Sequence, residues 1–490
     1  MTKNLERIHD LVWGVPTLVM ILGVGIYLSF RTGFVQFLLF HALRLFGKKL
    51  GKKEHSRDMV SPYQALCTAL AATVGTGNLA GVAGAIAIGG PGSIFWMWVC
   101  ALLGMAVKYA EATLAVRYRV RSDNGEFFGG PMYMIRQGMP KKTHWLASVY
   151  CFFGVVAAFG VGNATQVNAV VCAADQVLIS FGGAQSVSGH LVMGVLLAAL
   201  IGTMLMGGMK RIGKAAEMLV PFASVLYIVL SLAVLFLCHR AIPEAFQRIF
   251  QGAFSPSAVT GGVVGSLIVA LRTGVSRGVF TNEAGMGTAS IAHAGADVIH
   301  PAEQGMMGLI EVFLDTIVIC TMTALVILVS GIHIPYGEDT GAALTTHAFA
   351  NVLGDWVSVV IAFMLALFAI ATVLGWGLYG TRCAQFLFGY GAGKRFVLLQ
   401  AITVVIGAVL ETQTVWILSG IVNGLMAIPN LIALAYLSPE LVRLTKEYRE
   451  ILAGKRANGG TNEDFYQRKS LPAFAYAKVP SPGGAGSESR

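Results

Sequence analysis

Charged residues are scarce in this sequence: Asp, Glu, Lys and Arg together make up 12% of its 490 residues. A soluble domain of ordinary composition carries about 25% of them. Hydrophobic residues reach 55%, so the chain cannot present a solvated surface on all sides. This scarcity of charge excludes a soluble enzyme and a disordered protein, and it indicates a protein surrounded by lipid.

Cysteine forms no metal-binding pattern. The seven cysteines are scattered, no two are spaced as Cys-x-x-Cys, and only Cys238 has a histidine beside it. At least six of them fall inside apolar runs, where a thiol behaves as a small packing residue. We therefore interpret the cysteines as packing residues rather than as metal ligands.

What the chain has in abundance is long apolar sequence rich in glycine, which occurs 59 times. A membrane-spanning helix needs about 20 consecutive apolar residues. Eleven runs come near this length, at residues 11–30, 64–88, 93–116, 145–173, 190–209, 216–238, 258–281, 305–331, 344–381, 396–411 and 414–437. The sequence therefore predicts an all-α integral membrane protein with about 11 transmembrane helices.

Lysine and arginine are distributed unevenly between the two sides of these spans. If the N-terminus lies outside the cell, the inward segments hold 28 basic residues and the outward segments hold 4. Basic residues are concentrated in cytoplasmic loops, so we predict a multi-pass plasma (inner) membrane protein with its N-terminus outside and its C-terminus cytoplasmic. The net charge of +10 then reflects membrane topology, and no nucleic-acid partner is expected.

Two segments lie outside the spans. Residues 31–46 alternate apolar runs with arginine and histidine, and this pattern predicts an amphipathic helix along the inner interface. Residues 439–490 end in a Gly- and Ser-rich stretch, and we predict a flexible cytoplasmic tail there.

Two spans are interrupted near their middle by glycine. The first break is predicted at Thr73–Asn78 and the second, about 200 residues later, within Arg272–Gly287. Each glycine destabilises a helix by about 1 kcal/mol relative to alanine. Each broken span begins a block of five spans, and an odd number of spans gives the two blocks opposite orientations in the membrane.

The predicted organisation is therefore one N-terminal helix followed by a 5+5 inverted repeat. The predicted boundaries are 1–60 for the N-terminal helix and basic interfacial segment, 61–240 and 241–438 for the two five-helix repeats, and 439–490 for the tail.

Interrupted helices in corresponding positions of two inverted halves indicate the binding site of a secondary transporter. The N-terminus of a half-helix offers N–H donors and a positive dipole to a carboxylate. Unwound carbonyls supply the oxygen ligands that a hard cation requires. The alternative is that these glycines only allow close helix packing, and the matched position of the two breaks favours the binding site.

A family resemblance is carried by five segments, whose order and spacing also match: GTGNLAGV (75–82), GGPGSIFWMWVCALLGMAVKYAEATLAVRYR (89–119), GGPMYMI (129–135), GVSRGVFTNEAGMGTASIAHAGA (274–296) and TVLGWGLYG (372–380). The chain resembles the alanine/glycine:cation symporter family. This resemblance implies a leucine-transporter-like fold and sodium-coupled uptake of a small neutral amino acid, such as alanine or glycine, across the lipid bilayer. Sodium would be the co-transported ion, and no covalent chemistry is expected, so the protein would not be an enzyme.

The resemblance also implies a set of site residues. The substrate-binding residues would be Gly75, Thr76, Gly77, Asn78, Gln166, Phe280, Thr281, Asn282, Thr372 and Trp376. The sodium ligands would be the carbonyls of Thr73 and Val74 together with Thr372. Asn163 and Gln166 are three residues apart, and in an α-helix they would share one face.

Charged residues within the spans need partners, because an unpaired charge in lipid costs several kcal/mol. Lys108 and Glu111 are three residues apart on one helix, and we expect them to satisfy each other. Glu311 and Asp315 share a face and have no obvious basic partner. They could bind a second cation or a proton, or they could be hydrogen-bonded acids facing neighbouring helices, which we favour.

Three rival functions remain at this point. A proton-coupled amino-acid transporter of the same general fold would use Glu311 and Asp315, and sodium dependence separates the two. A channel would need a ring of like residues, which the sequence does not suggest. A membrane enzyme is disfavoured because the Gly-x-Ser-x-Gly match at 274–278 lies in a predicted span, whereas a nucleophile elbow needs a strand-to-helix turn.

Overall fold

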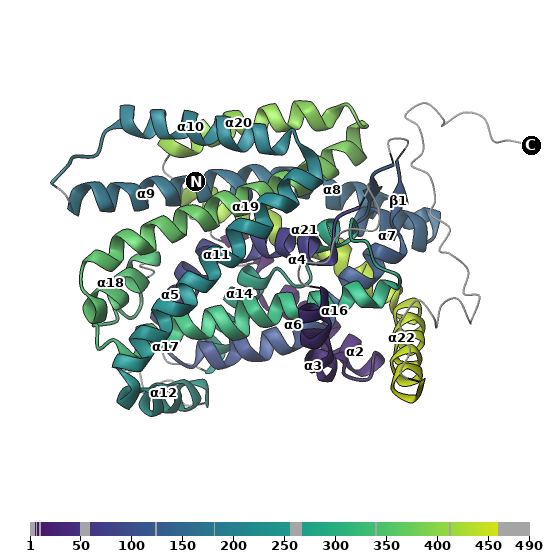
Figure 1. Cartoon of the computed structure of the whole chain (residues 1–490), viewed down its shortest axis with the longest axis horizontal. Coiled ribbons are helices and arrows are strands. Elements are labelled where there is room, and N and C mark those ends of the chain that lie inside the picture. The colour runs from purple at the N-terminus through teal and green to yellow at the C-terminus, as the bar shows by residue number, and fades with distance from the viewer. Residues whose placement is uncertain are drawn as a thin grey trace, which may run out of the picture.

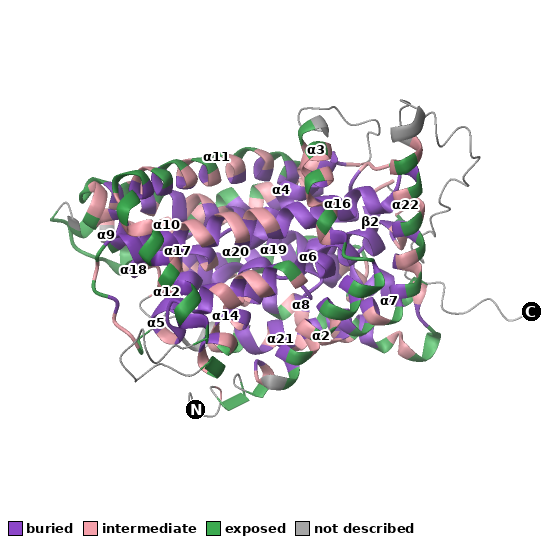
Figure 2. Ribbon diagram, turned by 90° about the horizontal axis from the view of Figure 1, so that it is seen from below, coloured by how far each residue is buried: buried purple, intermediate pink, exposed green. Residues whose placement is uncertain are grey.

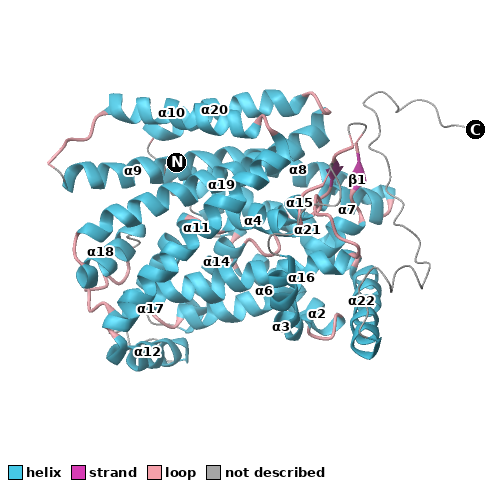
Figure 3. Ribbon diagram, viewed as in Figure 1, coloured by secondary structure: helices cyan, strands magenta, loops and turns pink. Residues whose placement is uncertain are grey.

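The computed structural model of the protein describes residues 5, 7–8, 11–49, 59–122, 125–180, 182–254, 267–338, 341–410 and 413–458. Helices make up almost all of this part of the chain (Figure 3). Within it, 7 helices are long and apolar enough to cross a membrane, or up to 10 if each bent pair counts as one span. The prediction of an all-α membrane protein is confirmed, whereas the count of eleven spans stays a prediction.

The elements of the first half of the chain are as follows. They are α2 (Val15–Arg31), η1 (Val35–Leu38), α3 (Leu39–Lys49), α4 (Pro62–Thr73), η2 (Gly77–Gly81), α5 (Val82–Gly89), α6 (Ser93–Arg117), β1 (Val120–Arg121), β2 (Phe127–Phe128), α7 (Pro131–Gly138), η3 (Lys141–Thr143), α8 (Trp145–Phe159), η4 (Gly160–Ala164), α9 (Thr165–Ser180), α10 (Val187–Leu205) and α11 (Gly208–Leu237). The two short strands pair antiparallel.

The second half begins with short helices outside the predicted spans. Its elements are η5 (His239–Ala241), α12 (Ile242–Phe254), α14 (Leu267–Asn282), α15 (Thr288–His293), α16 (Pro301–Val312), η6 (Phe313–Cys320), α17 (Thr321–Val329), α18 (Ala342–Leu353), α19 (Trp356–Phe388), α20 (Ala392–Val409), α21 (Gln413–Tyr436) and α22 (Ser438–Asn458). Three η segments, η2, η4 and η6, interrupt long helices, and all three are π-helical.

The first predicted break is present. Helix α4 starts at Ser61 with a capping box and a proline at its first turn, and both features favour a helix start. It ends at Thr73, because Val74 adopts an extended conformation (φ −78°, ψ 105°). The chain resumes as η2 and α5 after a bend of 52°.

The second break is shorter than the sequence suggested. Helix α14 continues to Asn282, and only residues 283–287 leave the helix. Gly274 and Gly278 are therefore helical glycines: an added Cβ would lie 2.3 Å from the Ser93 carbonyl oxygen and 3.2 Å from the Cys100 Cβ, both on α6. They allow α14 and α6 to approach closely, and their position within a helix excludes the nucleophile elbow.

The helices form two layers with connecting helices between them (Figure 1). Helices α6, α14, α16 and α17 lie on one side, where α6 packs against both α14 and α16. Helices α9, α10 and α20 lie on the other side, and α10 packs against α20. Helix α19 contacts α8, α9, α4 and α11. Packing of a helix from one block against one from the other is what an inverted repeat predicts, although the repeat itself stays a prediction.

Buried residues fill the centre of the bundle and exposed residues cover its outer surface (Figure 2). Large apolar side chains are exposed on the outer helices; Phe236, for example, is 78% exposed and Ile268 is 73% exposed. Surfaces of this kind are costly in water and favourable in lipid, so the outside of the bundle has the chemistry of a membrane protein.

The predicted flexible tail is wrong for residues 439–458, which form helix α22. Its apolar residues Leu441, Leu444 and Tyr448 recur every three to four positions and are buried, a helical periodicity that the sequence interpretation overlooked. Glu440 accepts a hydrogen bond from Arg117 of α6 at 2.8 Å. Hydrogen bonds from Arg443 and Arg117 lower the pKa of Glu440 to about 2, so this contact stays ionised at neutral pH. The remainder of the predicted tail lies outside the described residues.

Candidate functional site

A small pocket lies at the first break, between α4, α14, α19 and the η4–α9 region. The residues that line it are Ala72, Thr73, Gly75, Thr76, Gly77, Val161, Gln166, Phe280, Glu283, Thr372 and Trp376. Its volume is about 20 Å³, so the space is narrow.

Eight of the twelve residues predicted for substrate or sodium line this one pocket. The other four, which are Val74, Asn78, Thr281 and Asn282, lie beside it. Three lining residues are not among the predicted site residues: Ala72, Val161 and Glu283. Glu283 had a signal in the sequence, because it is an acid at the second break, whereas Ala72 and Val161 had none.

The first break brings Thr76 to Gln166. The hydroxyl of Thr76 donates a hydrogen bond to Gln166 Oε1 at 3.1 Å, and Gln166 Nε2 donates to the Val161 carbonyl at 3.1 Å. Gly77 begins the half-helix formed by η2 and α5 and lines the pocket. The positive end of that half-helix therefore lies at the pocket, next to an amide side chain that can donate or accept a hydrogen bond.

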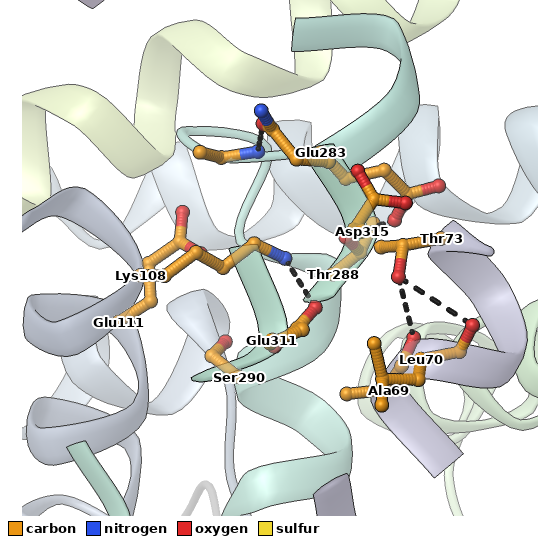
Figure 4. A network of polar contacts seen from close by, with 12 residues as sticks. Ala69, Leu70, Thr73, Lys108, Glu111, Glu283, Thr288, Ser290, Glu311 and Asp315 are labelled. Atoms are coloured by element: carbon orange, nitrogen blue, oxygen red, sulfur yellow. Dashed lines mark hydrogen bonds and ion pairs between the residues drawn. The ribbon is translucent and has the colours of Figure 1, made fainter. Parts of the chain in front are cut away.

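The predicted sodium ligands come from two elements that touch. An added Cβ at Gly75 would lie 2.8 Å from Thr372 Oγ1, so α19 passes directly against the unwound backbone. Thr372 Oγ1 donates its proton to the Phe368 carbonyl at 3.0 Å, which leaves its lone pairs available for a cation. The extended conformation of Val74 takes its carbonyl out of the helical ladder, while the Thr73 hydroxyl bonds back to its own helix (Figure 4).

Asn78 and Asn282 play matching roles at the two breaks. Asn78 Oδ1 accepts from the Gly75 amide at 2.8 Å, and its Nδ2 donates to Asp315 Oδ1 at 2.7 Å. Asn282 Oδ1 accepts from the Ala284 amide at 3.0 Å, and its Nδ2 donates to Thr316 Oγ1 at 3.1 Å. Each amide thus ties a break to η6.

Asp315 is the shared anchor of this arrangement. It accepts from Asn78 through one oxygen and from Thr316 through the other, at 2.8 Å. This geometry agrees with the interpretation of Asp315 as a hydrogen-bonded acid facing neighbouring helices. A direct contact of Asn78, Thr281 or Asn282 with substrate stays a prediction, because these residues lie beside the pocket lining.

The expected pairing of Lys108 with Glu111 is wrong. Lys108 Nζ lies 2.9 Å from Glu311 Oε1, and the other Glu311 oxygen lies 3.0 Å from His293 Nε2 (Figure 4). Glu311 therefore does have basic partners. They lie on α6 and α15, whereas Glu311 lies on α16, so spacing along one helix could not reveal them.

Glu111 instead closes the second break. Its Oε1 accepts hydrogen bonds from the Gly285 and Gly287 amides, both at 3.0 Å, and from Asn430 Nδ2 at 2.8 Å. A carboxylate of the chain itself therefore occupies the start of α15. Of the two half-helix starts expected to receive the carboxylate of a ligand, only the one at Gly77 lines the pocket.

Asn163 and Gln166 do not act together as the sequence suggested. Asn163 Nδ2 bonds to the carbonyl of Gln400 on α20 at 2.9 Å and also to the Gln400 side chain, whereas Gln166 faces Thr76. Asn163 lies within the π-helical turn η4, and Gln166 follows in α9. A π-helix has more residues per turn than an α-helix, so residues three apart no longer share a face.

A substitution at Gly162 tests the position of Trp376. An added Cβ at Gly162 would lie 2.3 Å from the Trp376 Cβ, so Gly162→Ala must displace the indole that lines the pocket. We expect ligand binding to weaken by about tenfold or more, corresponding to about 1–3 kcal/mol of overpacking. Gly23→Ala is the matched control, because an added Cβ there meets nothing within 4 Å. The affinity of each variant for alanine is measured by titration of the purified protein. Equal affinities would contradict the close packing of Gly162 against Trp376.

Comparison with known proteins identifies relatives along almost the whole chain. The family model described as the sodium:alanine symporter family matches residues 1–462. The sodium/alanine symporter AgcS of Methanococcus maripaludis is 43% identical over 461 residues, which cover 93% of this chain and 98% of that protein. The probable sodium/glutamine symporter GlnT of Bacillus subtilis is 38% identical, and the match covers 93% of each chain.

A solved structure supports the fold. The structure of MhsT in complex with L-phenylalanine superposes with a TM-score of 0.53 at 13% identity, and the match covers 81% of this chain and 99% of that one. At this identity the likeness concerns the fold alone, which is that of the leucine transporter. Because a family model and relatives above 30% identity match almost its whole length, the chain belongs to the sodium:alanine symporter family and is a multi-pass membrane transporter, not an enzyme.

Proposed function

We propose that this protein carries alanine, glycine or a similarly small neutral amino acid into the cell together with sodium, by alternating access. The observation that carries the proposal is the pocket itself. It joins the start of a half-helix, polar side chains that include Gln166 of α9 and Thr372 of α19, and the aromatic side chains of Phe280 and Trp376 around a narrow space. A ligand with a carboxylate and a very small side chain fits this chemistry.

The substrate carboxylate is expected at Gly75–Gly77, where the half-helix begins. Gln166, which accepts from Thr76 and donates one N–H to the Val161 carbonyl, has a second N–H to offer the carboxylate. Phe280 and Trp376 then limit the size of the substrate side chain that the pocket accepts. The relative GlnT is named for glutamine, so the size of the accepted side chain is a property of each pocket. The narrow space in this chain supports a methyl group or a hydrogen atom at that position.

Sodium is expected between the carbonyls of Thr73 and Val74 and the hydroxyl of Thr372. Gly75 of the first break and Thr372 of α19 are close enough for one cation to touch both elements. A cation held there stabilises the unwound backbone that also binds the substrate. Sodium and substrate binding are then coupled, and by linkage each tightens the other equally.

Uptake by reconstituted proteoliposomes tests the proposal. An inward sodium gradient should drive accumulation of radiolabelled alanine above its external concentration, and replacing sodium with choline should abolish it. A proton gradient at zero sodium is the competing condition, since a proton-coupled carrier of this fold is the rival. Accumulation driven by protons without sodium would overturn the proposal, and so would sodium-driven uptake of large amino acids in preference to alanine and glycine.

The orientation is part of the proposal. In Figure 1 helices α3, α7 and α22 lie toward one end of the bundle, and α12 and α18 lie toward the other. The ends rich in basic residues are expected in the cytoplasm. In a variant whose exposed native Cys172 is replaced by serine, Lys142→Cys should react with an impermeant maleimide only in inverted vesicles. Gln185→Cys should react only in intact cells, and the opposite pattern would exclude the proposed orientation.

A further inference from the structure

Glu283 is a lining residue of the pocket to which the proposed function gives no role. It follows directly after α14, is 4% exposed, and has a φ of +53°. Left-handed backbone in a residue other than glycine is strained, and it persists where the surrounding structure holds it in place. The second break thus places an acid in the pocket wall by means of an unfavourable backbone conformation.

The carboxylate of Glu283 is held by two neutral donors. Trp376 Nε1 donates to Oε1 at 3.1 Å, and Thr288 Oγ1 donates to Oε2 at 2.6 Å. Each bond fixes one oxygen and leaves further acceptor capacity on it, because a carboxylate has about four lone-pair sites. The side chain is therefore oriented by the protein but not saturated by it.

The hydrogen bonds that Glu283 accepts from the described residues come from Trp376 and Thr288, and neither donor is charged. Lys108 is close enough to attract the Glu283 carboxylate, but its ammonium is bonded to Glu311. Four acids, namely Glu111, Glu283, Glu311 and Asp315, are buried near this single lysine (Figure 4). An unpaired carboxylate in a membrane-embedded site is costly, so the pocket wall at Glu283 favours a cation supplied from outside the chain.

The pocket lining includes helix ends of opposite polarity. Gly77 begins a half-helix, whose start carries partial positive charge. Helix α14 ends at Asn282, where a helix carries partial negative charge, and Glu283 adds a carboxylate at that end. Together these ends complement a small zwitterion with its carboxylate at the first break and its ammonium at the second.

We propose that Glu283 binds the α-ammonium group of the substrate and makes the carrier select amino acids against 2-hydroxy acids and simple carboxylates of the same size. The assignment rests on the proposed function, since it places an amino acid in this pocket. Trp376 and Thr288 act as positioning residues that aim the carboxylate. Sodium binds at the separate group of oxygens from α4 and α19.

The test compares alanine with lactate and propionate, which keep the carboxylate but lack the ammonium. Binding of each is measured by isothermal titration at saturating sodium, for the parent protein and for Glu283→Gln. The parent should bind alanine at least about 100-fold more tightly than lactate, because a site built for a polar group rejects analogues that lack it. In Glu283→Gln alanine should weaken to near the affinity of lactate, while the affinity for lactate changes little.

Two controls separate this inference from its alternatives. Glu303→Gln removes a buried acid that does not line the pocket, and it should leave the ratio of alanine to lactate affinities unchanged. Sodium affinity without substrate is measured in parallel. If Glu283→Gln lost sodium binding and kept the alanine-to-lactate ratio, Glu283 would be a sodium ligand and the inference would be wrong.

The parent protein alone also decides the question if Glu283→Gln does not fold. Equal binding of alanine and lactate by the parent would overturn the role of Glu283 in any case. Failure of the parent to bind alanine at all in sodium would instead count against the proposed function. In a parent that binds alanine, an alanine-to-lactate ratio that persists in folded Glu283→Gln would count only against this inference.

Discussion

Alanine binding by Thr372→Val is expected to lose most of its dependence on sodium. In the parent protein sodium should tighten alanine by about 5- to 150-fold, the usual range of coupling between two sites. Valine keeps the shape of threonine but has no oxygen for a cation. Gly75→Ala should have the same effect by a different route, because its Cβ would lie 2.8 Å from Thr372 Oγ1 and would displace that hydroxyl. Alanine affinity measured at several sodium concentrations gives the coupling for each variant.

Thr381→Val is the matched control for this experiment. Thr381 lies on the same helix and bonds back to the Gly377 carbonyl at 2.7 Å, as Thr372 does to Phe368 at 3.0 Å, but it does not line the pocket. The alanine affinity of Thr381→Val should depend on sodium as it does in the parent protein. If the alanine affinity of Thr372→Val depended on sodium as in the parent, Thr372 would not be a sodium ligand, but the proposal of symport would be unaffected. Sodium-independent alanine binding in the parent would contradict symport itself.

The second large effect is expected at Lys108. Lys108 and Glu311 are an ion pair at 2.9 Å whose side chains are 0% and 1% exposed. Replacing one partner of a buried pair typically costs about 3–5 kcal/mol. Without Lys108 the Glu311 carboxylate would retain its contact with His293 at 3.0 Å but lose the permanent charge that neutralises it. Lys108→Met should therefore lower the free energy of unfolding by about that amount, which is measured by thermal or denaturant unfolding of the purified protein in detergent.

Replacing both partners should be milder than replacing one. The double variant Lys108→Met with Glu311→Leu leaves no stranded carboxylate, so it should recover much of the lost stability. Arg443→Ala is the surface control: its side chain is 49% exposed in pairs with Glu440 and Glu447, and exposed pairs contribute about 0–1 kcal/mol. Equal stability of Lys108→Met and Arg443→Ala would show that the buried pair is energetically unimportant.

The sequence by itself determined the environment, the class and the neighbourhood of the site. Low charge and long apolar runs identify a membrane protein because lipid does not solvate charged groups. Glycine pairs located the first break because glycine weakens a helix regardless of its surroundings. The motifs around 75–82, 274–296 and 372–380 identified the family and most residues of the pocket, since all lining residues except Val161 and Gln166 lie at or near those motifs.

Only the tertiary structure decided which side chains meet. Lys108 faces Glu311 rather than Glu111, and Glu111 closes the break at Gly285 and Gly287. Local spacing predicts contacts within one helix, whereas these partners come from different helices whose relative rotation is fixed by packing. Likewise, Asn163 lies within the π-helical turn η4 and bonds to Gln400, whereas Gln166 bonds to Thr76. The orientation of Glu283 toward the pocket depends on the same kind of information, because a strained backbone angle is set by the surrounding fold rather than by the residue itself.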